Sequence, residues 1–183
     1  MSENSRAFHY VCTLEEAHAL MGQHDRYWLA NCGCREKRGG CARSRTDLCL
    51  QFRDDTGVGD SSRREASREQ VEAVLAEARE KHLVPRPFRD EATLSRTDGI
   101  CFCCDDCCAY FLDRSERCDK GVYIERTDMA NCTDCGACVS VCHFGARGID
   151  KSSLVVHRED CYGCGLCVDA CPQECIEMVR REG

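Results

Sequence analysis

The sequence contains no apolar run that approaches the ~18 to 20 residues of a membrane-spanning helix. Its first thirty residues lack the apolar core of a signal peptide, and neither end resembles a lipidation signal. Positive charge is not in excess, because 25 Lys and Arg stand against 32 Asp and Glu, for a net charge of −7. We therefore expect a cytoplasmic protein with no direct membrane insertion, and no nucleic-acid partner, since phosphate binding needs a basic stripe.

Motifs of common enzyme classes are also missing. The chain has no Gly-rich nucleotide fingerprint, no P-loop and no clear acid–base or nucleophile constellation. The segment that ends in Cys142-His143 does not have the Cys-x-x-Cys-His spacing of a c-type haem site. We predict no catalytic residue. Whether the chain is an enzyme stays open, and an electron carrier or electron-transfer subunit is the preferred interpretation.

Cysteine is the residue in excess, with 20 in 183 positions. In a short secreted chain this abundance indicates a disulfide scaffold. That alternative is disfavoured here, because without export thiols stay reduced, and because adjacent pairs such as Cys103-Cys104 are awkward for independent disulfides. Repeated Cys-x-x-Cys spacing indicates metal chelation instead.

Two cysteine runs near the C-terminus have the spacing that binds [4Fe-4S] clusters. They are Cys132-x-x-Cys135-x-x-Cys138-x-x-x-Cys142-His143 and Cys161-x-x-Cys164-x-x-Cys167-x-x-x-Cys171-Pro172. The runs are copies of one another at an offset of 29 residues, which predicts pseudo-twofold symmetry. Each half is expected to form a strand, a cluster loop, a short helix (about 136–141 and 165–170) and a further strand (146–150 and 175–179).

Residues 122–181 resemble bacterial-type two-cluster ferredoxins at all eight ligand positions. The resemblance implies a ferredoxin-like (βαβ)2 fold and a crossed ligand pairing, in which the last cysteine of each run serves the other cluster. Cluster I then takes Cys132, Cys135, Cys138 and Cys171, and cluster II takes Cys161, Cys164, Cys167 and Cys142. One departure is His143, where the family usually has proline. Its imidazole either tunes the potential of cluster II or is an exposed turn residue of no consequence.

Residues 1–117 are expected to form a separate domain, with the ferredoxin-type domain at 118–183. Capping boxes at Thr13-x-x-Glu16 and Ser67-x-x-Gln70 predict helices to about residue 23 and about residue 82. The rest reads as Gly-rich and Arg-rich loops. The overall fold class is thus α+β, with a small, mostly helical and loop-rich N-terminal domain organised by metal.

Nine cysteines of the N-terminal segment are candidate metal ligands: Cys32, Cys34, Cys41, Cys49, Cys101, Cys103, Cys104, Cys107 and Cys108. One or two further iron–sulfur clusters are the preferred interpretation, structural zinc is the alternative, and unliganded thiols are the third. Cys103 and Cys104 are expected to belong to different sites. Arg35 could offset the charge of a cluster, although an exposed arginine is the default. Cys12, Cys118 and Cys175 lie outside ligand spacing and are interpreted as incidental thiols.

The motif Cys-x-Cys-Arg at 32–35, with the Ile-Cys-x-Cys-Cys-x-x-Cys-Cys run at 100–108, resembles a poorly characterised group of iron–sulfur proteins from anaerobes. This resemblance implies a low-potential, anaerobic setting. The predicted function is a multi-cluster electron-transfer protein or subunit that delivers electrons to an oxidoreductase, with a redox partner that presents a basic docking patch. Two alternatives stay open: an enzyme or reductive activator with a substrate-facing N-terminal cluster, and a zinc-organised docking module fused to a ferredoxin.

Overall fold

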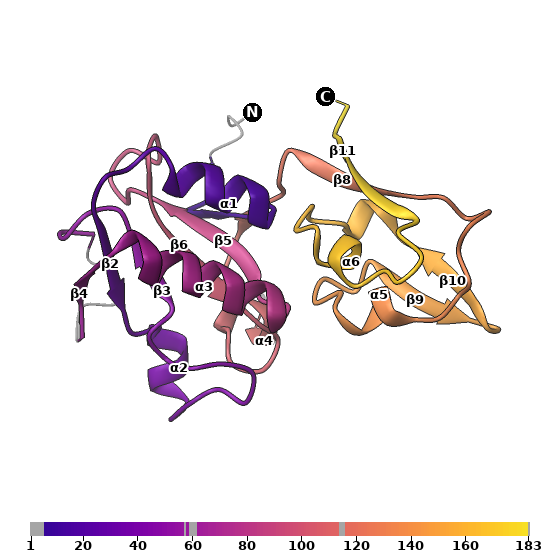
Figure 1. The fold of residues 1–183 in the computed structure, drawn as a ribbon, viewed down its shortest axis with the longest axis horizontal. Helices are drawn as coiled ribbons and strands as arrows, with labels where there is room; N and C mark the ends of the chain where they lie inside the picture. Colours follow the sequence, from indigo (N-terminus) through magenta and orange to yellow (C-terminus); the bar gives the residue numbers. More distant parts are fainter. Residues whose placement is uncertain (1–5, 57, 59–61, 114–115, 183) are drawn as a thin grey trace.

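The computed structural model describes residues 6–56, 58, 62–113 and 116–182. The chain folds into an N-terminal region built on one large sheet and a C-terminal region of two small sheets (Figure 1). The elements of the N-terminal region are β1 (His9–Tyr10), α1 (Leu14–Met21), β2 (Tyr27–Ala30), α2 (Gly33–Lys37), β3 (Cys49–Gln51), β4 (Arg64–Ala66), α3 (Arg68–Glu80), β5 (Val84–Arg89), β6 (Thr97–Cys103), α4 (Ala109–Asp113) and β7 (Cys118–Asp119). Those of the C-terminal region are β8 (Tyr123–Thr127), α5 (Ala137–Ser140), β9 (Arg147–Asp150), β10 (Ser153–Val156), the 3-10 turn η1 (Arg158–Asp160), α6 (Leu166–Asp169) and β11 (Ile176–Arg180).

A seven-stranded sheet organises the N-terminal region, in the order β4-β2-β3-β6-β5-β1-β7. Neighbouring strands are antiparallel except for β1 and β7, which run parallel. The expectation of a mostly helical, loop-rich domain was therefore wrong. The candidate ligands lie on or just beyond these strands, because Cys49 begins β3 and Cys101 and Cys103 lie in β6.

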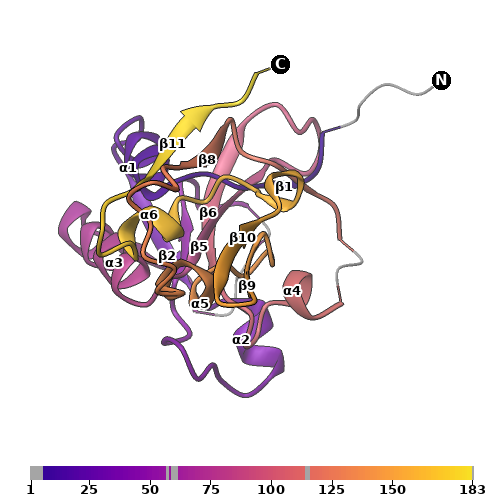
Figure 2. The same cartoon turned by 90° about the vertical axis from the view of Figure 1, so that its right-hand side faces the viewer.

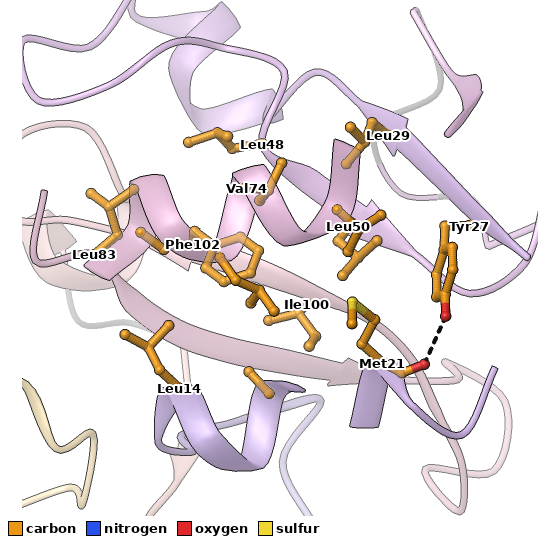
Figure 3. Packing of buried hydrophobic residues seen from close by; sticks show 14 of the residues in the cluster. Leu14, Met21, Tyr27, Leu29, Leu48, Leu50, Val74, Leu83, Ile100 and Phe102 are labelled. Atoms are coloured by element: carbon orange, nitrogen blue, oxygen red, sulfur yellow. Dashed lines mark hydrogen bonds between the residues drawn. The ribbon is translucent and has the colours of Figure 1, made fainter. Parts of the chain in front are cut away.

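The two predicted helices form and cover this sheet. Both capping boxes are present, with Thr13 accepting from the Glu16 N–H and Ser67 from the Gln70 N–H. Each pair satisfies two N–H groups that a helix start otherwise leaves without partners. Figure 3 shows the side chains of α1, α3, β3 and β6 that meet between the helices and the sheet, among them Leu14, Met21, Val74, Leu50, Ile100 and Phe102. Apolar side chains build most of this core, and the Cys104 and Cys107 thiols also belong to it, so burial of apolar surface contributes to its stability beside any bound metal.

The C-terminal region shows the predicted internal symmetry. Its first strand pairs with its last, β8 with β11, and β9 pairs with β10. Residues with left-handed backbone recur in pairs that are 29 positions apart: Gly136 and Gly165, Asp134 and Gly163, and Gly145 and Glu174. Each cysteine loop therefore turns in the same way before it enters α5 or α6, which is the geometry of a duplicated unit.

The junction between the regions lies slightly later than the expected boundary at residue 118. Cys118 and Asp119 form β7 and pair with His9 and Tyr10 of β1, so they belong to the N-terminal sheet. The chain then continues into β8, and Figure 2 shows the C-terminal region from its own side, with the N-terminal region behind it.

Candidate functional site

The ligand set predicted for cluster II surrounds one cavity. Cys142, Cys161, Cys164 and Cys167 all line it, together with apolar side chains that include Phe144 and Leu166. Burial raises the pKa of Cys164, and raises that of Cys167 to about 12. Thiols in such a place become thiolates when a metal supplies the compensating charge.

The set predicted for cluster I surrounds a second cavity. Cys132, Cys135, Cys138 and Cys171 line it, together with Cys175. The Cys175 thiol lies 3.5 Å from that of Cys171, so it is a fifth sulfur at this cavity. At the corresponding place in the other half, Ala146 lines the cavity of cluster II. Four thiols around each cavity are the donor set that a [4Fe-4S] cluster requires, so the residues fit the cofactor.

A buried ion pair, which no pattern in the sequence indicated, lies between the two sets. Arg147 donates through Nη1 to the Cys138 thiol at 3.4 Å, and through Nη2 to the Glu125 carboxylate and to Thr127. Its side chain is 1% exposed and that of Glu125 is 3% exposed. Burial opposes the charge of Arg147, but Cys167, Cys138 and Glu125 raise its pKa. A fixed positive charge therefore acts on ligands of both clusters.

Four N-terminal thiols form a contiguous group. The Cys34 thiol contacts those of Cys32 and Cys108, and Cys108 contacts Cys103. The Cys108 hydrogen bond and then Arg86 lower the pKa of Cys103 to about 6, although burial opposes them.

Arg86 is the buried cation of this four-thiol group. Its Nη1 lies 3.3 Å from the Cys108 sulfur and 3.6 Å from the Cys103 sulfur, and its guanidinium lies over the Tyr110 ring. The residue is 2% exposed, and its Nε has no hydrogen-bond partner among the residues that the structure describes. A buried guanidinium is stable beside negative charge. Glu116 supplies part of that charge at 2.9 Å from Nη2, and the two sulfurs lie beside Nη1.

Three further thiols form a second group. The sulfurs of Cys41, Cys104 and Cys107 lie within 4.8 Å of one another. Adjacent Cys103 and Cys104 thus point into different groups. Arg35, expected to be exposed by default, is buried beside this second group: it is 1% exposed, and it donates to the backbone carbonyls of Arg45 and Phe102.

The remaining two candidates belong to neither group. Cys49 and Cys101 contact one another, and Cys101 lies 3.9 Å from Nε2 of His9. Burial opposes protonation of this imidazole, but hydrogen bonds with Cys101 and Glu116 raise the pKa of His9 to about 9. The histidine had no partner at ligand spacing in the sequence. Strand pairing brings it here, because β1 joins β5 next to β6.

The four-thiol group and cluster II lie on two sides of one apolar junction. A single packed cluster contains Cys103 and Cys108 from the N-terminal region and Leu166 and Cys164 from the C-terminal region. Aromatic rings fill the space between them: Tyr110 contacts Phe144 and Tyr162, and Phe144 stacks on Tyr162 with centroids 4.4 Å apart. Aromatic side chains therefore lie between the two thiol sets.

His143 also lies in this junction, and the interpretation as an exposed turn residue was wrong. Its side chain is 2% exposed, its Nε2 donates to the His82 carbonyl at 2.9 Å, and its Nδ1 lies 3.5 Å from Asp105. The imidazole thus ties the loop that bears Cys142 to the N-terminal region. Cys12 lies buried in the main core, and Cys118 is half-buried beside Arg86. None of the twenty cysteines forms a disulfide.

Comparison with known proteins agrees with the C-terminal geometry. Residues 131–175 match the 4Fe-4S dicluster domain family. The chain is 39% identical over 62 residues to Electron transport protein HydN of Escherichia coli K12, a segment that covers 34% of this chain and 35% of that protein. It is 33% identical over 60 residues to a subunit of the ion-translocating oxidoreductase complex of Methanosarcina acetivorans, covering 33% of this chain and 23% of that protein. It is 36% identical over 55 residues to Pyruvate synthase subunit PorD of Methanothermobacter marburgensis, covering 30% of this chain and 64% of that protein.

The C-terminal region therefore carries a 4Fe-4S dicluster domain. The matched segment spans about a third of the length of HydN and less of the Methanosarcina protein. The family match does not reach the N-terminal region, whose resemblance to iron–sulfur proteins of anaerobes stays a prediction. Within the described residues, no helix is both long and apolar enough to span a membrane.

Proposed function

We propose that this protein is a multi-cluster electron-transfer protein or subunit that delivers low-potential electrons to an oxidoreductase of an anaerobe. The observation that carries the proposal is the pair of cavities, each lined by the four cysteines of one crossed ligand set. Cluster I is assigned to Cys132, Cys135, Cys138 and Cys171, and cluster II to Cys161, Cys164, Cys167 and Cys142. When bound, these clusters supply one-electron transfer at potentials set by their ligands, hydrogen bonds and burial.

The proposal extends to the N-terminal region, where Cys32, Cys34, Cys103 and Cys108 hold a third iron–sulfur centre. Support comes from Arg86, a buried cation whose Nη1 lies beside the Cys103 and Cys108 sulfurs, and from the position of this group across the junction from cluster II. The Tyr110 and Tyr162 rings contact one another between the two sets. Packed side chains join the sets, so an electron that enters at one end of the protein has a continuous route to the other.

The partner is proposed to dock at the end of the protein that carries cluster I. Cys135 is exposed there, as are Met129 and, next to the Gly136 turn, Ile149. A surface hollow beside Cys175 is lined by acidic side chains that include Asp128, Glu174 and Glu177. An acidic rim around an exposed cluster suits a basic docking patch on a redox partner, which would speed the encounter at low ionic strength.

Anaerobic EPR of the reduced protein tests the three-centre proposal, with Cys34→Ser as the variant. The wild type should give two ferredoxin signals and a third signal that is broadened by magnetic interaction with cluster II. Cys34→Ser should abolish the third signal and narrow that of cluster II. The matched control Cys12→Ser, a thiol of the apolar core, should leave all three unchanged. Two signals only, identical in wild type and Cys34→Ser, would refute the third centre.

Two other functions share part of this geometry. In one, the protein is an enzyme or reductive activator whose N-terminal centre binds a substrate; in the other, zinc shapes the N-terminal region into a docking module. The three-thiol group favours either one, because three ligands leave a tetrahedral ion with a free position. A substrate that shifts an N-terminal EPR signal would support the first, and an N-terminal region that contains zinc but no iron would support the second.

A further inference from the structure

The three-thiol group of Cys41, Cys104 and Cys107 has the dimensions of a site for one metal ion. The Cys104 sulfur lies 3.5 Å from that of Cys41 and 3.5 Å from that of Cys107. With Zn–S bonds of about 2.3 Å, the edges of a tetrahedral thiolate site are about 3.8 Å long.

The sequence around the group agrees with this size. Cys104 and Cys107 have Cys-x-x-Cys spacing on one tight turn, in which the Cys108 N–H donates to the Cys104 carbonyl. Such spacing is typical of zinc sites with thiolate ligands. Cys41 approaches from another loop, so the ion would connect two segments that are distant in the sequence.

That second loop is already held in place on two sides. The Ala42 N–H donates to Asp106 at 2.8 Å, and Arg43 forms a two-pronged ion pair with Asp105. Further along, Ser44 and Arg45 both bind Glu77 of α3. Because these contacts do not use the thiols, the site is preorganised, and both neighbouring aspartates are committed to other partners.

A buried cation supplies the second, independent sign of a charged site. Arg35 is 1% exposed and interacts with the Cys107 thiol, and its Nε has no hydrogen-bond partner among the described residues. Zn²⁺ with three thiolates carries a charge of −1, which one guanidinium balances. Arg35 also lies near the Cys32 thiol, so its positive charge faces both thiol groups.

We propose that Cys41, Cys104 and Cys107 bind one Zn²⁺ ion with three thiolates and one water, separate from the iron–sulfur centres. Among the residues that the structure describes, three side chains supply ligand atoms to this group, and all three are cysteines. Cys41 is half-buried, so the fourth position faces the surface side of the site. The ion connects the 41–47 loop to the turn after β6, and so it stabilises the neighbouring four-thiol group.

Zinc and iron analysis of the full chain, purified without oxygen, tests the site together with zinc-edge X-ray absorption. The wild type should contain one zinc per chain, with three sulfur neighbours at about 2.3 Å and one lighter atom. Cys41→Ser should lose zinc or drop to two sulfur neighbours, with its iron and sulfide unchanged. The control Cys118→Ser, a half-buried thiol outside the group, should keep the wild-type zinc content.

Three results would overturn the proposal: no zinc in the wild type, four sulfur neighbours, or loss of iron and sulfide from Cys41→Ser. Unchanged iron and sulfide in that variant shows that it has folded, so loss of zinc alone supports the site. The electron-transfer proposal fails separately, if the wild type has too little iron and sulfide for the two ferredoxin clusters.

Discussion

The buried charge of Arg147 should raise the reduction potentials of the ferredoxin clusters, and Arg147→Met should lower them. Reduction adds negative charge to a cluster, so loss of the neighbouring cation disfavours it. The Arg147 Nη1 to Cys138 sulfur distance is 3.4 Å. Taking ~6 Å from the guanidinium to the centre of the cluster charge and an effective dielectric constant of ~20, the interaction is ~2.8 kcal/mol. For a one-electron couple this corresponds to ~120 mV as an upper bound.

The adjacent carboxylate of Glu125 reduces that figure, because the cluster experiences both charges. A fall of about 50 mV is therefore expected for Arg147→Met, about half the upper bound. Glu125→Gln should shift the potentials in the opposite direction, upward. The double variant should lie nearer the wild type than Arg147→Met does, since both charges leave together.

Stability should respond as well. Removing one partner of a buried ion pair usually costs about 3 to 5 kcal/mol. Glu125 keeps a hydrogen bond from Thr127 and has Arg158 at 3.5 Å, so we expect a cost near ~3 kcal/mol for Arg147→Met. The double variant should recover part of this loss.

EPR-monitored redox titration without oxygen measures the potentials, and denaturant unfolding measures the stability. Arg126→Met is the matched control. Arg126 follows Glu125 in β8 and is paired with Glu177 of β11, but both side chains are about 60% exposed. It should change the potentials by less than ~15 mV and the stability by less than ~1 kcal/mol. Equal shifts for Arg147→Met and Arg126→Met, or a rise for Arg147→Met, would refute the reasoning.

Three further predictions follow from the fold. Gly163→Ala should lose cluster II, because the φ of Gly163 is +83° and a Cβ there would lie 2.2 Å from a backbone oxygen. Gly136→Ala should cost only ~1 kcal/mol and keep both clusters, because the φ of Gly136 is +76° and there is space for a Cβ. Iron analysis of the two variants measures the cluster content. His143→Ala should destabilise the protein by ~1 to 3 kcal/mol in denaturant, since the His82 carbonyl loses a buried donor, and exposed His157→Ala should be neutral. Removing metal with chelator and oxidant should leave most helical circular dichroism intact, because the core beneath α1 and α3 is apolar; collapse of that signal would contradict this.

The C-terminal region could be predicted in detail because its structure is dictated by local patterns. Fixed cysteine spacing, a 29-residue repeat and glycine at left-handed turns act within a few residues of one another. The two capping boxes belong to the same class of signal, and they placed the starts of α1 and α3 correctly.

The large sheet could not be predicted, because its strands are short and one contains two prolines. β5 includes Pro85 and Pro87, which normally argue against a strand. The Pro85 carbonyl accepts from the Cys12 N–H, so its nitrogen faces the β1 side of β5. Strand β1 has two residues and pairs with β5 only at His9 and Phe88, so the missing N–H groups leave little pairing unmade.

Buried arginines are the other feature that sequence reasoning missed. Arg35 and Arg86 are at most 2% exposed, and the side chain of Arg147 is 1% exposed. Arginine is otherwise among the residues least often buried. Each lies against cysteine sulfur, from strands or loops that are distant in the sequence. An Arg next to a ligand motif, as in Cys34-Arg35, is a weak local signal, while Arg86 and Arg147 become recognisable only once the strands are paired.

The count of iron, acid-labile sulfide and zinc per chain, on protein purified without oxygen, tests the central claim most directly. Two ferredoxin clusters and one N-terminal centre on Cys32, Cys34, Cys103 and Cys108 predict about 12 iron and 12 sulfide, with one zinc on the three-thiol group. About 8 iron and 8 sulfide with two zinc ions would contradict the claim that the N-terminal region takes part in electron transfer, and would make it a zinc-stabilised module on a two-cluster ferredoxin.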